Sequence, residues 1–220
     1  MTGHFRKRLP TVGVISANPF MLLHRPTLTL TVLLAFAGQY ASSAKALGTL
    51  REPDVSEKKT TYKIKGNSVA ELNAQMVELG PVDKNKRHHN AYTTWFVTWN
   101  FDCGNFGGVY RAEHIRVKVE VKYIFPKWEA PADASPELVK KWTDYVAALQ
   151  KHEDGHKEIG LQAGREILAK CEGLPPAFSC EEVSRAINEA GQKILNLYRQ
   201  TEVRYDLETR HGATQGAQLK

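Results

Sequence analysis

Two histidines and a glutamate lie within five residues of one another, because residues 152–156 read His-Glu-Asp-Gly-His. On a helix, histidines at positions i and i+4 project from one face about one turn apart, so both imidazoles can bind one Zn²⁺. The intervening glutamate then lies near the open coordination position, where it can act as a general base toward water. The spacing therefore favours a zinc site with His152 and His156 as ligands and Glu153 as the base.

The residues around this motif predict a long helix from about Ser135 to Cys171. Ser135 can cap the first turn, and the following Pro136 and Glu137 are typical of a helix start. Residues at steps of three and four form one face: Leu138, Trp142, Tyr145, Leu149, His152, His156, Ile159, Ala163 and Ile167. Both histidines therefore face the core, where polar groups need partners. A metal would supply that partner, and a pair of hydrogen-bonded core histidines is the alternative.

A catalytic zinc usually has three protein ligands, and the residues alone leave the third one open. Residues 186–190 superficially resemble the glutamate helix of thermolysin-like enzymes, but Glu189 lies roughly 135° from the apolar face at about 100° per residue. Asp206 and His211 in the C-terminal tail are the other candidates, and Asp206 could instead fix a histidine tautomer. Tyr205 could donate a hydrogen bond to a developing oxyanion, or could be a core tyrosine.

The remaining pattern predicts an α+β domain, with one small antiparallel sheet followed by two long helices. Ser68 with Glu71, and Ser179 with Glu182, are capping boxes for two further helices. The strict alternation of apolar and charged residues in 111–125 indicates a half-exposed antiparallel strand. The expected strands are 60–64, 92–101 and 111–125, and the expected helices around the central one are 68–79 and 179 to about 201 or beyond.

The first 46 residues are expected to be a signal peptide that directs the protein to the periplasm or the medium. An apolar run at 27–41 is followed by small residues suited to cleavage, and Met21 is an alternative start. The run is too short to predict a stable membrane span. Residues 47–59 are expected to form an irregular lead-in, and residues 60–220 the metallopeptidase domain.

The net charge does not indicate a nucleic-acid partner. All charged residues of the predicted signal peptide are basic, namely Arg6, Lys7, Arg8, Arg25 and Lys45. Without them the formal net charge falls from +6 to +1. The basic character therefore belongs mostly to the segment that is expected to be removed. The basic loop around His88 and His89 is expected to be solvated, because adjacent histidines lack the one-face geometry of a ligand pair.

Export would allow the cysteines to form a disulfide. Cys171 and Cys180 flank a turn-rich connection between the two long helices, so we expect these two to pair. Closing this small loop would stabilise the fold by roughly 2–3 kcal/mol. Cys103 is then left over, and it is expected to be a small buried apolar residue.

Two segments together resemble a bacterial family described as predicted secreted zinc-dependent proteases, a domain of unknown function. The first is Trp142 with residues 152–156, and the second is the tail at 205–212 and 214–217. The likeness covers about Thr60 to the C-terminus. It implies a zincin-like fold, export, and a zinc site that includes His211.

Taken together, these features predict an exported zinc-dependent metallopeptidase in which His152, His156 and His211 hold Zn²⁺ and Glu153 is the general base. The expected partner is a peptide or protein substrate, and strand 111–125 is the candidate edge for binding it by β-augmentation. A non-catalytic envelope protein stapled by zinc is one alternative, and Asp206 or a loop histidine as a fourth ligand would favour it. A zinc hydrolase acting on a non-peptide amide, such as a cell-wall bond, is another.

Overall fold

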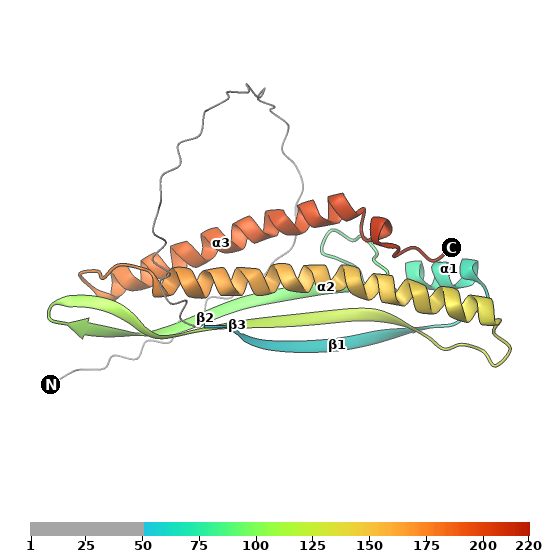
Figure 1. Ribbon diagram of the computed structural model, residues 1–220, viewed down its shortest axis with the longest axis horizontal. Coiled ribbons are helices and arrows are strands. Elements are labelled where there is room, and N and C mark those ends of the chain that lie inside the picture. Colours follow the sequence, from blue (N-terminus) through green and yellow to red (C-terminus); the bar gives the residue numbers. More distant parts are fainter. Residues whose placement is uncertain (1–50) are drawn as a thin grey trace, which may run out of the picture.

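The structure is a computed structural model that describes residues 51–220, so the predicted signal peptide and Met21 lie outside the described residues. Within this range a small sheet is combined with helices, which confirms the α+β class (Figure 1). The elements follow in this order: β1 (Asp54–Ile64), α1 (Val69–Leu79), β2 (Tyr92–Phe106), β3 (Val109–Trp128), α2 (Pro136–Glu172), α3 (Cys180–Thr209) and the short 3₁₀ helix η1 (Ala213–Gln215). Ser68, Ser135 and Ser179 cap the helices as expected.

The sheet is mixed, whereas the sequence predicted an antiparallel one. Its strand order is β1-β3-β2, with β2 antiparallel and β1 parallel to β3. The chain runs along β1, passes through α1, returns along β2 and runs back along β3, so that β3 lies between the other two. Strand β1 begins at Asp54, which corrects the expectation that residues up to 59 are irregular.

The central position of β3 also corrects the prediction that residues 111–125 form a substrate-binding edge. From Lys118 to Ile124, β3 is paired with both neighbouring strands and has no free edge there. Alternation of apolar and charged residues describes the two faces of a strand, not its two edges, so the sequence pattern could not locate this strand in the sheet. The edge strands are β1 and β2.

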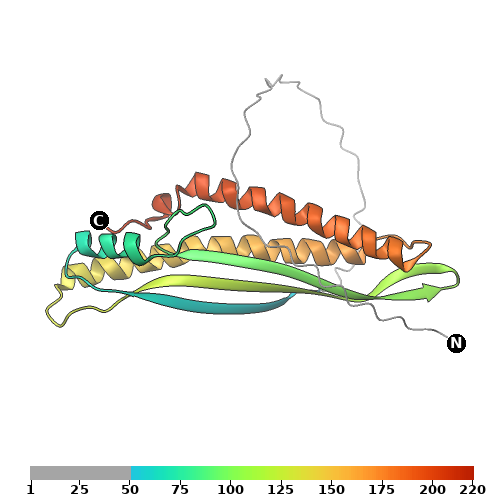
Figure 2. The same ribbon diagram turned by 180° about the vertical axis from the view of Figure 1, so that it is seen from behind.

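Helix α2 lies along one face of the sheet and forms the core with it (Figures 1 and 2). The predicted apolar face of the helix is largely buried, including Tyr145, Leu149 and Ile167. The strands bury alternate residues against it, such as Val97 in β2 and Val119 in β3. The two motif histidines lie on this buried face, as the periodicity predicted.

Helix α3 runs back along α2 in the opposite direction, on the side of α2 away from β1 (Figure 1). It buries Val183, Ile187 and Leu195 and continues to Thr209 before the chain turns at Arg210. Its C-terminal turns therefore return to the region of the His-Glu-Asp-Gly-His motif. Between residues 51 and 220, no helix is both long and apolar enough to cross a membrane.

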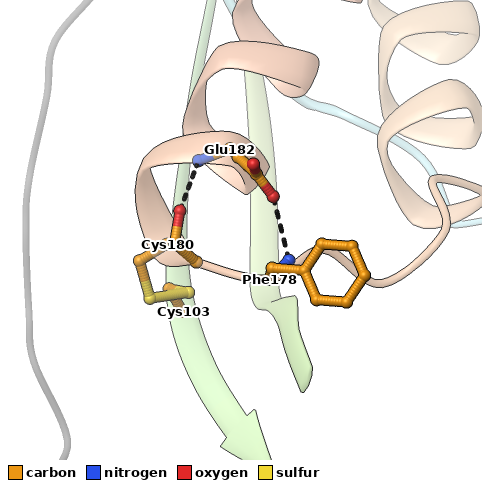
Figure 3. Close-up of a disulfide and its surroundings, with 5 residues drawn as sticks. Cys103, Phe178, Cys180 and Glu182 are labelled. Atoms are coloured by element: carbon orange, nitrogen blue, oxygen red, sulfur yellow. Dashed lines mark hydrogen bonds between the residues drawn. A yellow bond between two sulfur atoms is a disulfide. The ribbon is translucent and has the colours of Figure 1, made fainter. Parts of the chain in front are cut away.

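The disulfide differs from the predicted one, because Cys180 pairs with Cys103 while Cys171 is free and buried. The connection between the long helices lies against β3, where the amide of Tyr110 donates to the carbonyl of Ala177 at 2.8 Å, and that of Ala177 donates back at 2.9 Å. This contact places the start of α3 beside the β2–β3 hairpin (Figure 3). Sequence proximity favoured Cys171, but its side chain faces the core at 2% exposure.

Replacing either cysteine of the disulfide should destabilise the protein by the same amount. Cys103→Ser and Cys180→Ser are each expected to lower the free energy of unfolding by about 2–5 kcal/mol, because the bridge constrains the unfolded chain. The double variant should lose little more than either single one. Denaturant unfolding of protein without the predicted signal peptide measures both effects.

Cys171→Ala is the matched control, because it removes a buried sulfur but leaves the bridge intact. Non-reducing peptide mapping of this variant should still recover the Cys103–Cys180 pair. Recovery of a bridge that contains Cys171 from the wild-type protein would contradict the structure.

Candidate metal centre

Three side chains from two helices converge in the region of the motif. His152 and His156 of α2 are 4% and 7% exposed, and their Nε2 atoms lie 3.3 Å apart. Asp206 of α3 places Oδ1 at 3.1 Å from Nε2 of His156 and at 3.3 Å from Nε2 of His152. The three atoms form a compact triangle, and these residues are the group in 51–220 whose ligand atoms could hold a metal ion.

The size of this triangle fits a zinc ion. Ligand atoms that surround zinc tetrahedrally at about 2.0–2.1 Å lie about 3.3–3.4 Å from one another. The three edges of the triangle, at 3.1–3.3 Å, are close to this separation. Two imidazole nitrogens and one carboxylate oxygen are also a donor set typical of catalytic zinc, in which a fourth position stays open.

The outer nitrogens of both imidazoles have acceptors that fix the direction of the rings. Nδ1 of His156 lies 3.0 Å from a carboxylate oxygen of Glu202, whose other oxygen accepts a hydrogen bond from Trp95 at 2.7 Å. Nδ1 of His152 lies 3.0 Å from Oε1 of Gln215. When Nδ1–H donates outward, Nε2 is the unprotonated nitrogen of each neutral ring. It faces the centre of the triangle, where it could bind a metal.

The electrostatics of this cluster favour a cation, because the carboxylates of Glu153, Glu202 and Asp206 surround two imidazoles. Burial alone would lower the pKa of His156, but hydrogen bonds to Asp206 and Glu202 outweigh burial and raise this pKa to about 10 in the metal-free protein. Burial likewise opposes the ionisation of Asp206, yet hydrogen bonds with His152 and His156 hold the pKa of its carboxyl well below the usual range. A divalent cation would balance the same negative charge.

Glu153 is buried beside the triangle, with 4% of its surface exposed. The hydroxyl of Thr93 in β2 donates to its Oε2 at 2.6 Å. Burial raises the pKa of the Glu153 carboxyl, against the opposing effects of His156 and Thr93. The glutamate of the motif is therefore held in a defined orientation next to the ligand atoms.

The cluster opens into a cavity of about 540 Å³. Its walls are the start of β2 with the preceding loop, the middle of α2, and the C-terminal part of α3, together with His211 and Ala217 of the tail. His152, Glu153, His156 and Asp206 all line this cavity. A substrate in the cavity would therefore meet both the ligand atoms and the glutamate.

His211 lies at the edge of the centre. Its Nδ1 is 3.4 Å from Oδ2 of Asp206, the oxygen that points away from the histidine pair, and its side chain is 58% exposed. Arg210 and His211 both have positive φ, 50° and 52°, where the chain leaves α3. The structure thus groups Asp206 with the motif histidines, and His211 contacts Asp206 from outside. Glu189 is exposed and lies outside the cluster, as its helix phase predicted.

Tyr205 supports the helix and does not face the cavity. Its ring stacks on that of His152 with centroids 5.2 Å apart, and its hydroxyl donates to the main-chain carbonyl of His152 at 3.1 Å. The hydroxyl also contacts the side chain of Gln215. A Cβ atom at Gly155 would overlap this hydroxyl, so the glycine of the motif allows the close approach. The expected oxyanion role of Tyr205 is therefore not supported by its position.

Sequence reasoning missed three residues of the centre, and two of them had a readable signal. Thr93 has the same strand parity as the buried Trp95, so it faces the same side. Glu202 precedes Asp206 by four residues, which places both on one face once α3 is known to extend to Thr209. Gln215 ends the short 3₁₀ helix η1, which has too few residues for periodicity to indicate a direction.

The comparisons with known proteins place the chain in a family but assign it no activity. No curated protein and no solved structure gives a significant match to the chain. Residues 59–212 match the family described as "Bacterial protein of unknown function (DUF922)". This range is more than half of the chain and contains the motif, Glu202, Asp206 and His211. The chain therefore belongs to the bacterial family DUF922.

Proposed function

We propose that the protein is an exported zinc-dependent peptidase in which His152, His156 and Asp206 hold Zn²⁺. The observation that carries the proposal is the buried triangle of two Nε2 atoms and one Oδ1 atom, of zinc-binding size, beside a glutamate in an open cavity. Zinc at this place would polarise a substrate carbonyl and make water a stronger nucleophile. His211, which the family resemblance implied as third ligand, would instead orient Asp206 through its outer oxygen.

Glu153 is the general base in this proposal. Its carboxylate lines the cavity next to the ligand triangle, and Thr93 fixes one of its oxygens. In the reaction Glu153 accepts the proton of the attacking water and then passes it to the nitrogen of the leaving amine. The water oxygen becomes part of the new carboxyl group, and the peptide C–N bond breaks.

Strand β2 is the element best placed to bind an extended peptide. It pairs only with β3 in the sheet of the described residues, and Tyr92 to Trp95 line the cavity. A substrate could therefore add to its open edge by main-chain hydrogen bonds, with its side chains alternating between the cavity and solvent. This edge strand favours a peptide over another amide, such as a cell-wall bond.

A structural zinc site is the main alternative, because the three ligands join α2 to α3. Such a site would have four protein ligands. The proximity of His211 to Asp206 is the observation that favours it. The buried Glu153, directed at the same cavity by Thr93, favours catalysis.

Export is supported by two independent features. The sequence predicts a signal peptide in residues 1–46, and the Cys103–Cys180 disulfide is typical of an oxidising compartment. A periplasmic or secreted enzyme is therefore the proposal that accounts for both.

The ligand set can be tested by metal retention. Asp206→Ala is expected to lose zinc on dialysis, as are His152→Ala and His156→Ala, because each removes one corner of the triangle. His211→Ala should keep zinc with an affinity reduced about 10- to 100-fold, the usual cost of losing an outer partner. Competition with a chelating dye measures the affinities.

Glu189→Ala is the matched control, because this residue is a carboxylate on α3 outside the cluster. It should bind zinc as the wild-type protein does. Complete loss of zinc in His211→Ala together with retention in Asp206→Ala would contradict the proposed ligand set.

Catalysis can be separated from metal binding by Glu153→Gln. The amide keeps the size of the side chain and can still accept the hydrogen bond from Thr93, but it cannot accept the proton of water. The variant should bind zinc normally and lose peptide hydrolysis by at least about 10²-fold. Zinc content, melting temperature and cleavage of a peptide library are measured on both proteins in one buffer. Equal cleavage by the two proteins would rule out this mechanism.

A further inference from the structure

A basic loop forms one wall of the cavity that contains the metal centre. This loop, residues 81–90, joins α1 to β2 and carries Lys84, Lys86 and Arg87 but only one acid, Asp83. Arg87 and His88 line the cavity. Arg199 of α3 lines the same cavity. Two arginines therefore line the cavity that contains the ligand triangle.

The basic loop has a defined conformation, which depends on the buried side chain of Asp83. The Asp83 carboxylate accepts hydrogen bonds from the amides of Asn85 and Arg87, at 2.8 and 3.0 Å. It also accepts from Nε of Arg87 at 2.8 Å and contacts Nε2 of His89 at 3.2 Å. The His89 ring stacks on Tyr92, with centroids 5.1 Å apart, which attaches the loop to the start of β2. The position of Arg87 is therefore set before any ligand binds.

The carboxylates that line the cavity all have hydrogen-bond partners, whereas Arg87 uses only part of its guanidinium group on Asp83. Each carboxylate that lines the cavity has a hydrogen-bond partner: Asp83 with Arg87, Glu153 with Thr93, Glu202 with His156, and Asp206 with the histidine pair. Arg87 uses Nε and one terminal nitrogen on Asp83, and its side chain remains 50% exposed. Arginine has five N–H donors in a fork that matches a carboxylate. The cavity wall therefore offers charged donors to an incoming anion.

The basic loop leads directly into the strand that is proposed to bind the peptide. The loop continues without a break into Tyr92, the first residue of β2, and Tyr92 to Trp95 line the cavity. A peptide paired with this stretch of β2 would extend past Arg87 and His88 at one of its ends. The group that meets Arg87 would then belong to a residue close to the bond that is cleaved.

Building on the proposed peptidase function, we propose that the basic loop selects substrates with a carboxylate close to the scissile bond, and that Arg87 is its main recognition residue. The carboxylate belongs to an Asp or Glu side chain or to the C-terminus of the peptide. A charge-assisted hydrogen bond to a pre-positioned arginine favours such a substrate over its neutral counterpart. Because Arg87 is half exposed, this preference should weaken as salt is added.

The test uses matched peptides and two loop variants. The peptides carry Glu or Gln at each position around the scissile bond, with either a free or an amidated C-terminus. Wild-type kcat/KM should be at least about tenfold higher for a Glu peptide or a free C-terminus than for the neutral match. Arg87→Gln should abolish this preference. Lys86→Gln removes the same charge one residue away, outside the cavity lining, and should keep it. A preference for Glu in amidated peptides identifies the side chain, and one for the free acid alone identifies the C-terminus.

A binding measurement separates this inference from the peptidase proposal. Zinc-loaded Glu153→Gln protein is titrated with the same peptides, so that no cleavage is needed. Tighter binding of the acidic peptide that depends on Arg87 supports the inference even if the wild-type protein cleaves nothing. Equal binding and equal cleavage of acidic and neutral peptides would overturn it.

Removing Arg87 takes a partner from buried Asp83, so the loop itself needs a control. The double variant Asp83→Asn with Arg87→Gln replaces the ion pair by two amides, and its thermal unfolding is compared with that of the wild type. If this variant unfolds like the wild type and lacks the acidic preference, the effect is recognition and the inference stands. If it keeps the acidic preference, Arg87 is not the recognition residue.

Discussion

The structure depends on two imidazoles that lie on the buried face of a long helix and need polar partners there. Residues around His152 and His156 on α2 are packed against the sheet, where an unpaired polar group costs several kcal/mol. Helix α3 and the tail after it supply these partners, namely Glu202 and Asp206 from α3 and Gln215 from the tail. The packing of α3 on α2 and the geometry of the candidate metal centre therefore depend on the same contacts.

Each element around α2 has a separate part in the site. Strand β2 contributes Thr93, which orients Glu153, and Trp95, which holds Glu202. The disulfide fixes the start of α3 to the far end of the β2–β3 hairpin, so the helix is secured at the end opposite to Asp206. The buried faces of α2 and the sheet thus act as a rigid support. The histidines and carboxylates of the candidate site line the cavity.

Local pattern predicted much of this arrangement, because caps and periodicity depend on neighbours in the chain. The span of α2, its buried face and the location of His152 and His156 on that face all agree with the sequence. Contacts between distant segments were harder to predict. The insertion of β3 between β1 and β2, and the pairing of Cys180 with Cys103, depend on how elements far apart in sequence are placed.

The sequence alone also could not tell whether Asp206 or His211 lies at the third corner of the triangle. Asp206 and His211 are five residues apart, and either could reach the histidines if the chain ended its helix early. Because α3 continues to Thr209, Asp206 stays on the helix face toward α2, and His211 follows the turn to the edge of the cavity. Helix length, which capping signals define only loosely at this end, therefore determines which of the two side chains lies beside the histidines.

The most direct test of the account is a crystal structure of the zinc-loaded protein, with the metal located by its anomalous scattering. We predict one zinc ion bound by Nε2 of His152, Nε2 of His156 and Oδ1 of Asp206, with the fourth position facing the cavity and free of protein ligands. His211 should remain bound to the outer oxygen of Asp206. A zinc ion closed off by four protein ligands, or bound away from this triangle, would contradict the proposed catalytic site.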